Sequence, residues 1–161
     1  MPVSSTAVML STMPARRRRP ADVVAAGLAA AALSGVPSTA YALARRRDVL
    51  EGALAAGTLL LPREHRRGPL LASATVAHLG LSLGWAAVLA RTLPERRPLL
   101  WAPVAGVAIA ALDLGVIGRR FDAIRALETA PQVADHVAYA LTVAAVLSGL
   151  PTRYRSRITR G

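Results

Sequence analysis

The chain has no cysteine and no lysine, and it is poor in charged residues. Without cysteine it can form no disulfide, thiolate metal site or thiol nucleophile. Charged residues occupy 18% of its 161 positions, whereas soluble domains carry about 25%. The charge is missing in blocks, which is typical of membrane proteins. All 20 basic residues are arginines, a bias that we attribute to GC-rich coding and to no particular chemistry.

The common motifs of soluble enzymes are also missing. There is no P-loop, no GxGxxG after a strand and no GxSxG, so we expect no enzyme. A net charge of +11 would suggest a nucleic acid partner for a soluble protein. Here the arginines stand at the ends of apolar runs. We therefore expect them to set topology and to contact anionic lipid headgroups, and we expect no nucleic acid as partner.

The clearest apolar run extends from Leu70 to Ala90, between Arg67 and Arg91. About 20 helical residues cross a hydrocarbon core of roughly 30 Å, and three other stretches resemble this one. The sequence predicts an all-α, polytopic membrane protein built as a four-transmembrane-helix bundle. The spans lie at about residues 21–44, 69–90, 99–118 and 132–150, inside a membrane domain of residues 21–150. A disordered basic segment, 1–20, is expected before it and a basic tail, 151–161, after it.

The first span contains two local signals. Pro37, in the stretch GVPST, removes a backbone donor and predicts a kink. Ala42-Leu43-Ala44 matches a signal-peptide cleavage site, which leaves removal of residues 1–44 open, but the apolar run exceeds 20 residues and favours a retained helix. Beyond this span, Val49–Leu61 is too short to cross a membrane and predicts a short interfacial helix.

The arginines also predict topology. With both termini on one side, 11 arginines lie on that side and nine on the other. The dense cluster Arg16–Arg19 abuts the first helix, which favours cytoplasmic N- and C-termini. We expect a multi-pass protein of a bacterial plasma membrane.

A few polar residues interrupt the apolar spans. Ionisable groups in hydrocarbon cost several kcal/mol unless they are paired, so they usually face the bundle interior. Residues at helical spacing from them extend each position into a polar stripe. We predict an outer-half pocket, open to ligand, lined by Thr75, His78, Ser82, Asp113, Asp135, His136 and Tyr139.

Several interpretations of these residues remain open. Asp113 and its partners could only fix helix register, or they could bind a ligand or relay protons. Haem ligation by His78 and His136 needs both rings at one depth, whereas their estimated depths differ by roughly 8 Å. A metal held by Asp113 and the two histidines suits zinc chemistry, but no ligand spacing supports it. We predict no cofactor. Asp135 also suits a simple role at a helix N-terminus.

The second, third and fourth spans are rich in alanine and glycine. Small residues let transmembrane helices approach closely, which predicts compact packing. It leaves open whether the chain works alone, as a homo-oligomer or with a membrane protein partner.

Four segments, GVPST, AHLGLSLGW, LDLGVIGRRF and QVADHVAY, give the chain its recognisable order of features. In this order it resembles uncharacterised small four-helix integral membrane proteins of high-GC bacteria. The resemblance implies a fold and no activity. We expect a structural or accessory membrane protein that acts through a partner. The alternative is a small transporter or sensor whose pocket is lined by His78, Asp113 and His136.

Overall fold

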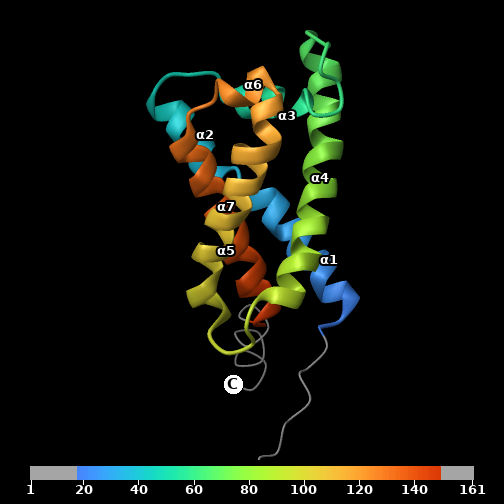
Figure 1. The fold of residues 1–161 in the computed structure, drawn as a ribbon, viewed down its shortest axis with the longest axis vertical. Helices are drawn as coiled ribbons and strands as arrows, with labels where there is room; N and C mark the ends of the chain where they lie inside the picture. Colours follow the sequence, from blue (N-terminus) through green and yellow to red (C-terminus); the bar gives the residue numbers. More distant parts are fainter. Residues whose placement is uncertain (1–17, 150–161) are drawn as a thin grey trace, which may run out of the picture.

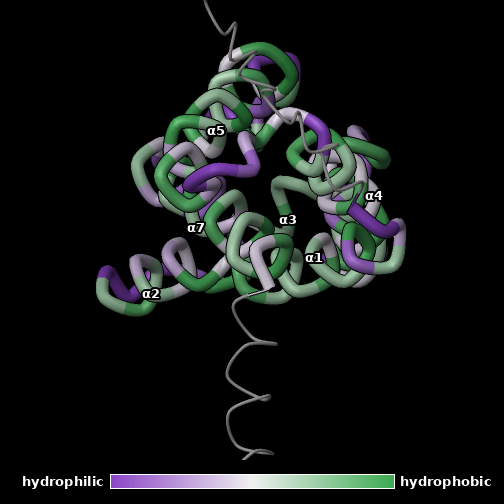
Figure 2. The backbone as a smooth tube through the Cα atoms, turned by 90° about the horizontal axis from the view of Figure 1, so that it is seen from below, coloured by the Kyte–Doolittle hydropathy of each residue, from purple (hydrophilic) through white to green (hydrophobic). Residues whose placement is uncertain are grey.

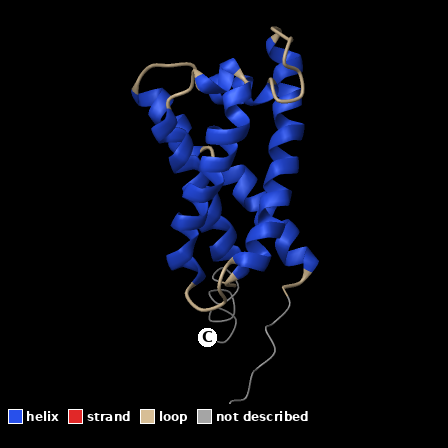
Figure 3. Cartoon of the chain, viewed as in Figure 1, coloured by secondary structure: helices blue, strands red, loops and turns tan. Residues whose placement is uncertain are grey.

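A computed structural model describes residues 18–149, and these residues form helices and loops with no strand (Figures 1 and 3). The predicted all-α class is confirmed. Most of the predicted N-terminal segment, residues 1–17, and the whole predicted tail, 151–161, lie outside the described residues.

The first apolar stretch is broken into two helices, as Pro37 predicts. Helix α1 spans Pro20–Leu33 and α2 spans Val36–Ala44, with Pro37 in the first turn of α2. Proline is tolerated there because a first-turn N–H has no intrahelical partner. The hydroxyl of Ser38 donates to the carbonyl of Gly35 at 3.3 Å. The break therefore starts a new helix N-terminus inside the first apolar stretch.

Helix α3, Glu51–Gly57, is the short helix that the sequence predicts between the first two spans. It packs against the first half of α4, which spans Arg67–Thr92. Gly57 makes this contact possible, since a Cβ at that position would lie 2.2 Å from the carbonyl oxygen of Leu70. The hydroxyl of Ser73 donates to the Gly57 carbonyl at 2.7 Å. The place of α3 is thus decided by α4; its position relative to a membrane surface stays a prediction.

The predicted third span, 99–118, is not regular throughout. Helix α5 spans Pro98–Leu112 and continues as the π-helix η1, Asp113–Ile117, and the 3-10 turn η2, Gly118–Arg120. The short helix α6, Asp122–Arg125, follows. Single-turn π segments inside a helix are rare and occur frequently at functional sites. The change of winding begins at Asp113, the one charged residue of the predicted span.

Helix α7, Thr129–Leu147, corresponds to the predicted fourth span, 132–150. In the described part of the chain, three stretches are long and apolar enough to cross a membrane: Pro20–Ala44, Arg67–Thr92 and Pro98–Arg120. α7 is not among them, because Gln132, Asp135 and His136 make its first half polar. It packs on α1, α2, α4 and α5 and buries Tyr139, Ala140, Val143 and Ala144.

Small residues fill the contacts between the long helices. The core contains Ala26, Ala30, Ala86, Ala102, Ala140 and Ala144. A Cβ on Gly106 of α5 would lie 2.6 Å from the Cα of Val137 in α7. These two helices are therefore in near backbone contact, as the small residues predict.

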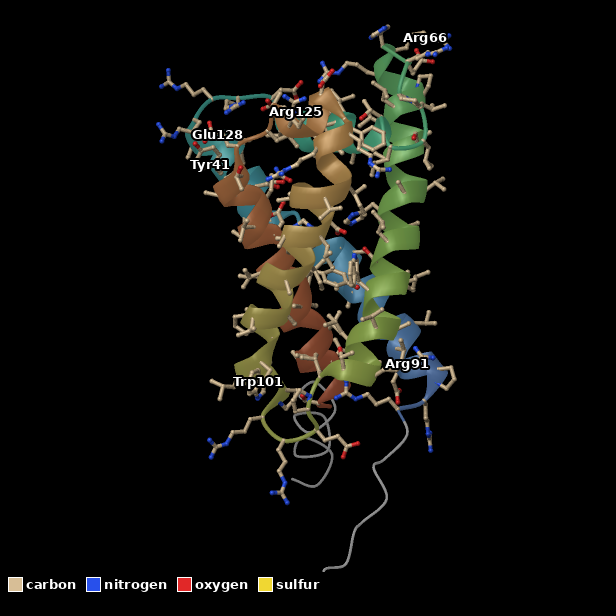
Figure 4. The ribbon with its side chains drawn as sticks, in the orientation of Figure 1. Tyr41, Arg66, Arg91, Trp101, Arg125 and Glu128 are labelled. Carbon is tan, nitrogen blue, oxygen red and sulfur yellow. The ribbon has the colours of Figure 1, made fainter. Side chains whose placement is uncertain are left out.

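Large apolar side chains, in contrast, lie on the outside. Many of them are 40–66% exposed, including Val24, Leu28, Leu43, Val76, Leu81, Val104, Val107 and Val116. Apolar segments predominate along α1, α4 and α5 (Figure 2). Arg66 and Arg125 lie at one end of the molecule and Arg91 at the other (Figure 4). An apolar exterior bounded by arginines is expected of a protein surrounded by lipid.

Candidate functional site

Asp113 contacts polar side chains of two other helices. The indole Nε1 of Trp85, on α4, donates to its Oδ2 at 3.1 Å, and Nε2 of His136, on α7, lies 3.3 Å from the same oxygen. The side chain of Asp113 is 16% exposed. Its other oxygen, Oδ1, is buried and has no partner among the described residues. A buried carboxylate oxygen without a donor is uncommon and needs an explanation.

His136 lies between two hydrogen-bond acceptors. Its Nδ1 is 2.7 Å from the carbonyl oxygen of Gln132, and its Nε2 faces the Asp113 carboxylate. A neutral imidazole donates from one nitrogen only. Both contacts are satisfied when the ring is doubly protonated, or when the second proton resides on Asp113 and is donated to Nε2. The imidazole of His136 therefore lies between two acceptors, and it can donate to both only when both ring nitrogens carry a proton.

The side chain of Asp135 binds the backbone of α2, the second of the two helices formed by the first apolar stretch. Its Oδ1 accepts a hydrogen bond at 2.8 Å from the backbone N–H of Ser38, in the first turn of α2. The first N–H groups of a helix have no intrahelical partner, and the helix dipole favours a negative charge there. Asp135 thus stabilises the N-terminus of α2, a helix that packs against its own helix α7.

The remaining predicted site residues make contacts of their own. His78 Nε2 is 2.9 Å from the carbonyl oxygen of Ala31, in the last turn of α1. The hydroxyl of Tyr139 donates to the carbonyl of Ser82, and that of Thr75 donates to its own helix at Leu71, at 2.9 Å. Two of these contacts join different helices, so part of the predicted polar stripe has a structural role.

A cavity of about 1160 Å³ lies among α2, α3, α4, η1 and α7, in the half of the molecule that contains α3 and α6. Its wall is mainly apolar. It includes all seven residues predicted to line a pocket, namely Thr75, His78, Ser82, Asp113, Asp135, His136 and Tyr139. Ligand cavities typically measure about 300–1,000 Å³ and combine apolar walls with a few convergent polar groups. The structure thus brings the predicted residues together around a space large enough for a small molecule.

A network of charged residues lies at the rim of this cavity. Arg47 binds Glu51 through Nη2 and Oε1 at 2.7 Å, and it also pairs with Glu128, which accepts a hydrogen bond from Tyr41. Tyr41 and Glu128 are adjacent in Figure 4. The hydrogen bond to Glu51 is the main cause that raises the pKa of Arg47. These contacts connect the loop after α2 to the first turn of α3 and to the start of α7.

The geometry argues against the haem and metal alternatives. Both ring nitrogens of His136 are engaged, with Gln132 and Asp113, so neither is free to bind iron or zinc. His78 contacts the Ala31 carbonyl through Nε2 only, so it is His136 that lacks a free ring nitrogen. Within residues 18–149, no three His, Asp or Glu side chains are placed to hold one metal ion.

The sequence did not reveal the rim. Arg47, Asp48, Glu51 and Glu128 lie between the predicted spans and are not among the predicted site residues. The spacing of Arg47 and Glu51, four residues apart, is the signal that could have indicated their pairing. Nothing comparable links Arg47 to Glu128, which are 81 positions apart.

Comparisons with protein-family models, with curated proteins and with solved structures find no match to this chain. The case for a function therefore depends on the arrangement of its own side chains.

Proposed function

We propose that this chain is a multi-pass protein of a bacterial plasma membrane, with four crossings and cytoplasmic termini. Three helical stretches have the length and apolarity for a crossing. We assign the fourth crossing to α7, whose polar first half lies against the cavity and whose second half is buried by α1 and α5. A helix enclosed by other helices can be less apolar than one that faces lipid. Arg16–Arg19 and the positive-inside rule support the orientation.

We propose further that the protein binds a small ligand in the cavity, as a carrier or a sensor. The observation that carries this proposal is the cavity of about 1160 Å³ with Asp113, Asp135 and His136 in its wall. Ionisable side chains inside a membrane protein usually mark a substrate or proton pathway. With termini in the cytoplasm, the cavity lies in the outer half of the bilayer. The proposal involves binding and transport or signalling, and no covalent step.

The absence of cysteine allows a direct test. In a Thr75→Cys variant the only thiol would line the cavity, on a side chain that is exposed there. In a matched Val104→Cys variant the thiol would lie on the outer face of α5. Val104 is 60% exposed there and does not line the cavity. A thiol in hydrocarbon stays protonated and reacts slowly, since the thiolate is the nucleophile.

We expect a membrane-impermeant methanethiosulfonate to label the Thr75→Cys variant from the outer side only, and to leave the Val104→Cys variant unlabelled. Tetraphenylphosphonium and tetraphenylborate, two ions of similar shape, then serve as probes of occupancy. Slower labelling of the Thr75→Cys variant with either ion supports a ligand cavity. Labelling from the cytoplasmic side alone contradicts the proposed orientation, and labelling that neither ion slows contradicts the proposed ligand cavity.

A structural or accessory role is the second candidate. The observation that favours it is the junction at Asp113, where Trp85 from α4 and His136 from α7 meet one carboxylate oxygen. Such a junction fixes helix positions without a ligand. An Asp113→Asn variant separates the two roles. Under the structural role only stability or assembly changes; under the ligand role, protection by the probe ions disappears in a protein that still folds.

A further inference from the structure

Acidic residues are strongly concentrated around the cavity. The chain has nine acidic residues, and five of them line this space: Asp48, Glu51, Asp113, Glu128 and Asp135. Among the described residues, Arg47 is the only arginine that does so, in a chain with 20 arginines and a net charge of +11. The cavity wall therefore carries the opposite charge balance to the rest of the protein.

The acidic residues differ in how well they are neutralised. At the rim, Arg47 pairs with Glu51 and Glu128, and Arg67 pairs with Asp48. Deeper in the cavity wall, Asp135 faces the N-terminus of α2, and Asp113 faces His136 and leaves Oδ1 without a donor. No described arginine pairs with either of these two aspartates. A carboxylate that no arginine neutralises, within a low-dielectric wall, favours a cation nearby.

Aromatic rings complete the wall. Trp85, Tyr41 and Tyr139 all line the cavity, and the chain has only two tryptophans and three tyrosines in total. The faces of aromatic rings attract cations, tryptophan most strongly, and desolvated contacts contribute about 2 kcal/mol. Mainly apolar walls, aromatic rings and carboxylates together match an organic cation with apolar groups. An inorganic cation would need several oxygen ligands at one point, and the described residues offer no such cluster.

We propose that the cavity binds a lipophilic organic cation, with Asp113 as its counter-ion, in exchange for the proton held between Asp113 and His136. This rests on the proposed ligand-binding function and names its ligand class. Before binding, the pair holds one proton, on the imidazole or on the carboxylate. When the cation reaches the Asp113 carboxylate, His136 becomes a neutral imidazole and one proton leaves to solvent. One positive charge enters and one leaves, so the charge within the cavity is unchanged.

Other titratable groups face this pair. Asp135 is on the same helix as His136, His78 lies on α4, and Tyr139 lies one turn further along α7. Asp135 and His78 are hydrogen-bonded to the α2 N-terminus and to the Ala31 carbonyl. We therefore assign the exchanged proton to the Asp113–His136 pair. The imidazole of His136 lies between the Gln132 carbonyl and the Asp113 carboxylate, and one more proton lets both contacts be hydrogen bonds.

The experiment uses the full chain in uncharged detergent, with tetraphenylphosphonium and tetraphenylborate as ions of similar shape and opposite charge. The chain has two tryptophans. In a Trp101→Phe variant, the fluorescence reports on Trp85 in the cavity. We expect tetraphenylphosphonium to quench it saturably, with at least tenfold higher affinity than tetraphenylborate. We also expect about one proton released per cation bound, measured with a pH indicator in weak buffer.

Two substitutions in this background locate the effect. Asp113→Asn should weaken cation binding at least tenfold and abolish proton release. Asp122→Asn, at an exposed residue outside the cavity that pairs with Arg125, should change neither.

Quenching by tetraphenylborate that equals or exceeds quenching by the cation overturns the cation assignment and leaves a ligand cavity in place. Cation binding without proton release overturns the exchange. If neither ion quenches Trp85, the proposed ligand-binding function fails as well. The comparison of the two ions needs no substitution at Asp113, so it stands even if Asp113→Asn fails to fold.

Discussion

Gly106 gives the sharpest test of how α5 and α7 are packed. A Cβ added at this position would lie 2.6 Å from the Cα of Val137 and 2.7 Å from the carbonyl oxygen of His136. Both are backbone atoms, which cannot rotate away as the end of a side chain can. Ordinary carbon contacts are about 3.5–4.0 Å. The Gly106→Ala substitution therefore requires the two helices to separate by about 1 Å.

A separation of this size has two consequences. Overpacking a well-packed helix contact costs about 1–3 kcal/mol of folding free energy. In addition, the His136–Asp113 contact is already 3.3 Å long, at the upper end of hydrogen-bond distances. Another 1 Å or so would break it, because Asp113 directly follows α5 and His136 is on α7. We expect Gly106→Ala to lose about 1–3 kcal/mol and to impair the Asp113–His136 pair.

The measurement is the free energy of unfolding in mixed micelles, titrated with a denaturing detergent. Gly84→Ala is the matched control, since a Cβ there meets nothing within 4 Å. It should be neutral, or more stable by up to about 1 kcal/mol, because alanine favours helix. Equal stability of Gly106→Ala and Gly84→Ala would refute the close approach of α5 and α7.

Three further changes test other parts of the fold. Gly57→Ala should displace α3 from α4 and destabilise the protein, whereas Gly68→Ala, in open space, should not; protease sensitivity of residues 51–66 distinguishes them. Asp135→Asn should loosen the start of α2 by removing the charged acceptor of the Ser38 N–H, by about 1 kcal/mol, seen as faster amide exchange at Ser38. The Arg66 guanidinium, with two backbone N–H groups, lowers the pKa of Glu64 to about 2 from 4.5, so its carboxylate stabilises the turn before α4 above about pH 4.5. That stabilisation should be lost as the pH falls from 4.5 to 2, and amide exchange in a Glu64→Gln variant should lack this pH dependence.

Much of the fold could be predicted because its signals are local. The apolar blocks gave the positions of α1, α2, α4 and α5 to within a few residues, and Pro37 located the break between α1 and α2. The π-helix at Asp113 has no such signal. It begins at Asp113, whose side chain contacts α4 and α7, two helices that are far away in the sequence.

The site was predictable in its members and less so in its contacts. All seven predicted residues line the cavity, because polar groups in apolar helices avoid lipid and turn inward. Their partners depend on the rotation and relative depth of each helix. Asp135 therefore faces a backbone N–H of α2, and His78 faces a carbonyl of α1. Neither contact follows from the spacing of residues within one helix.

Residue types and their periodicity alone determined that this chain is helical, that long apolar helices alternate with arginine clusters, and that a few polar groups face inward. These properties follow from transfer free energies and from backbone geometry, which act on each segment separately. Only the tertiary structure decided that α7 is enclosed by other helices, that five carboxylates surround one cavity, and that His136 lies between the Gln132 carbonyl and the Asp113 carboxylate. The reason is that hydrogen bonds and charge interactions act over a few ångströms, between atoms that only folding brings together.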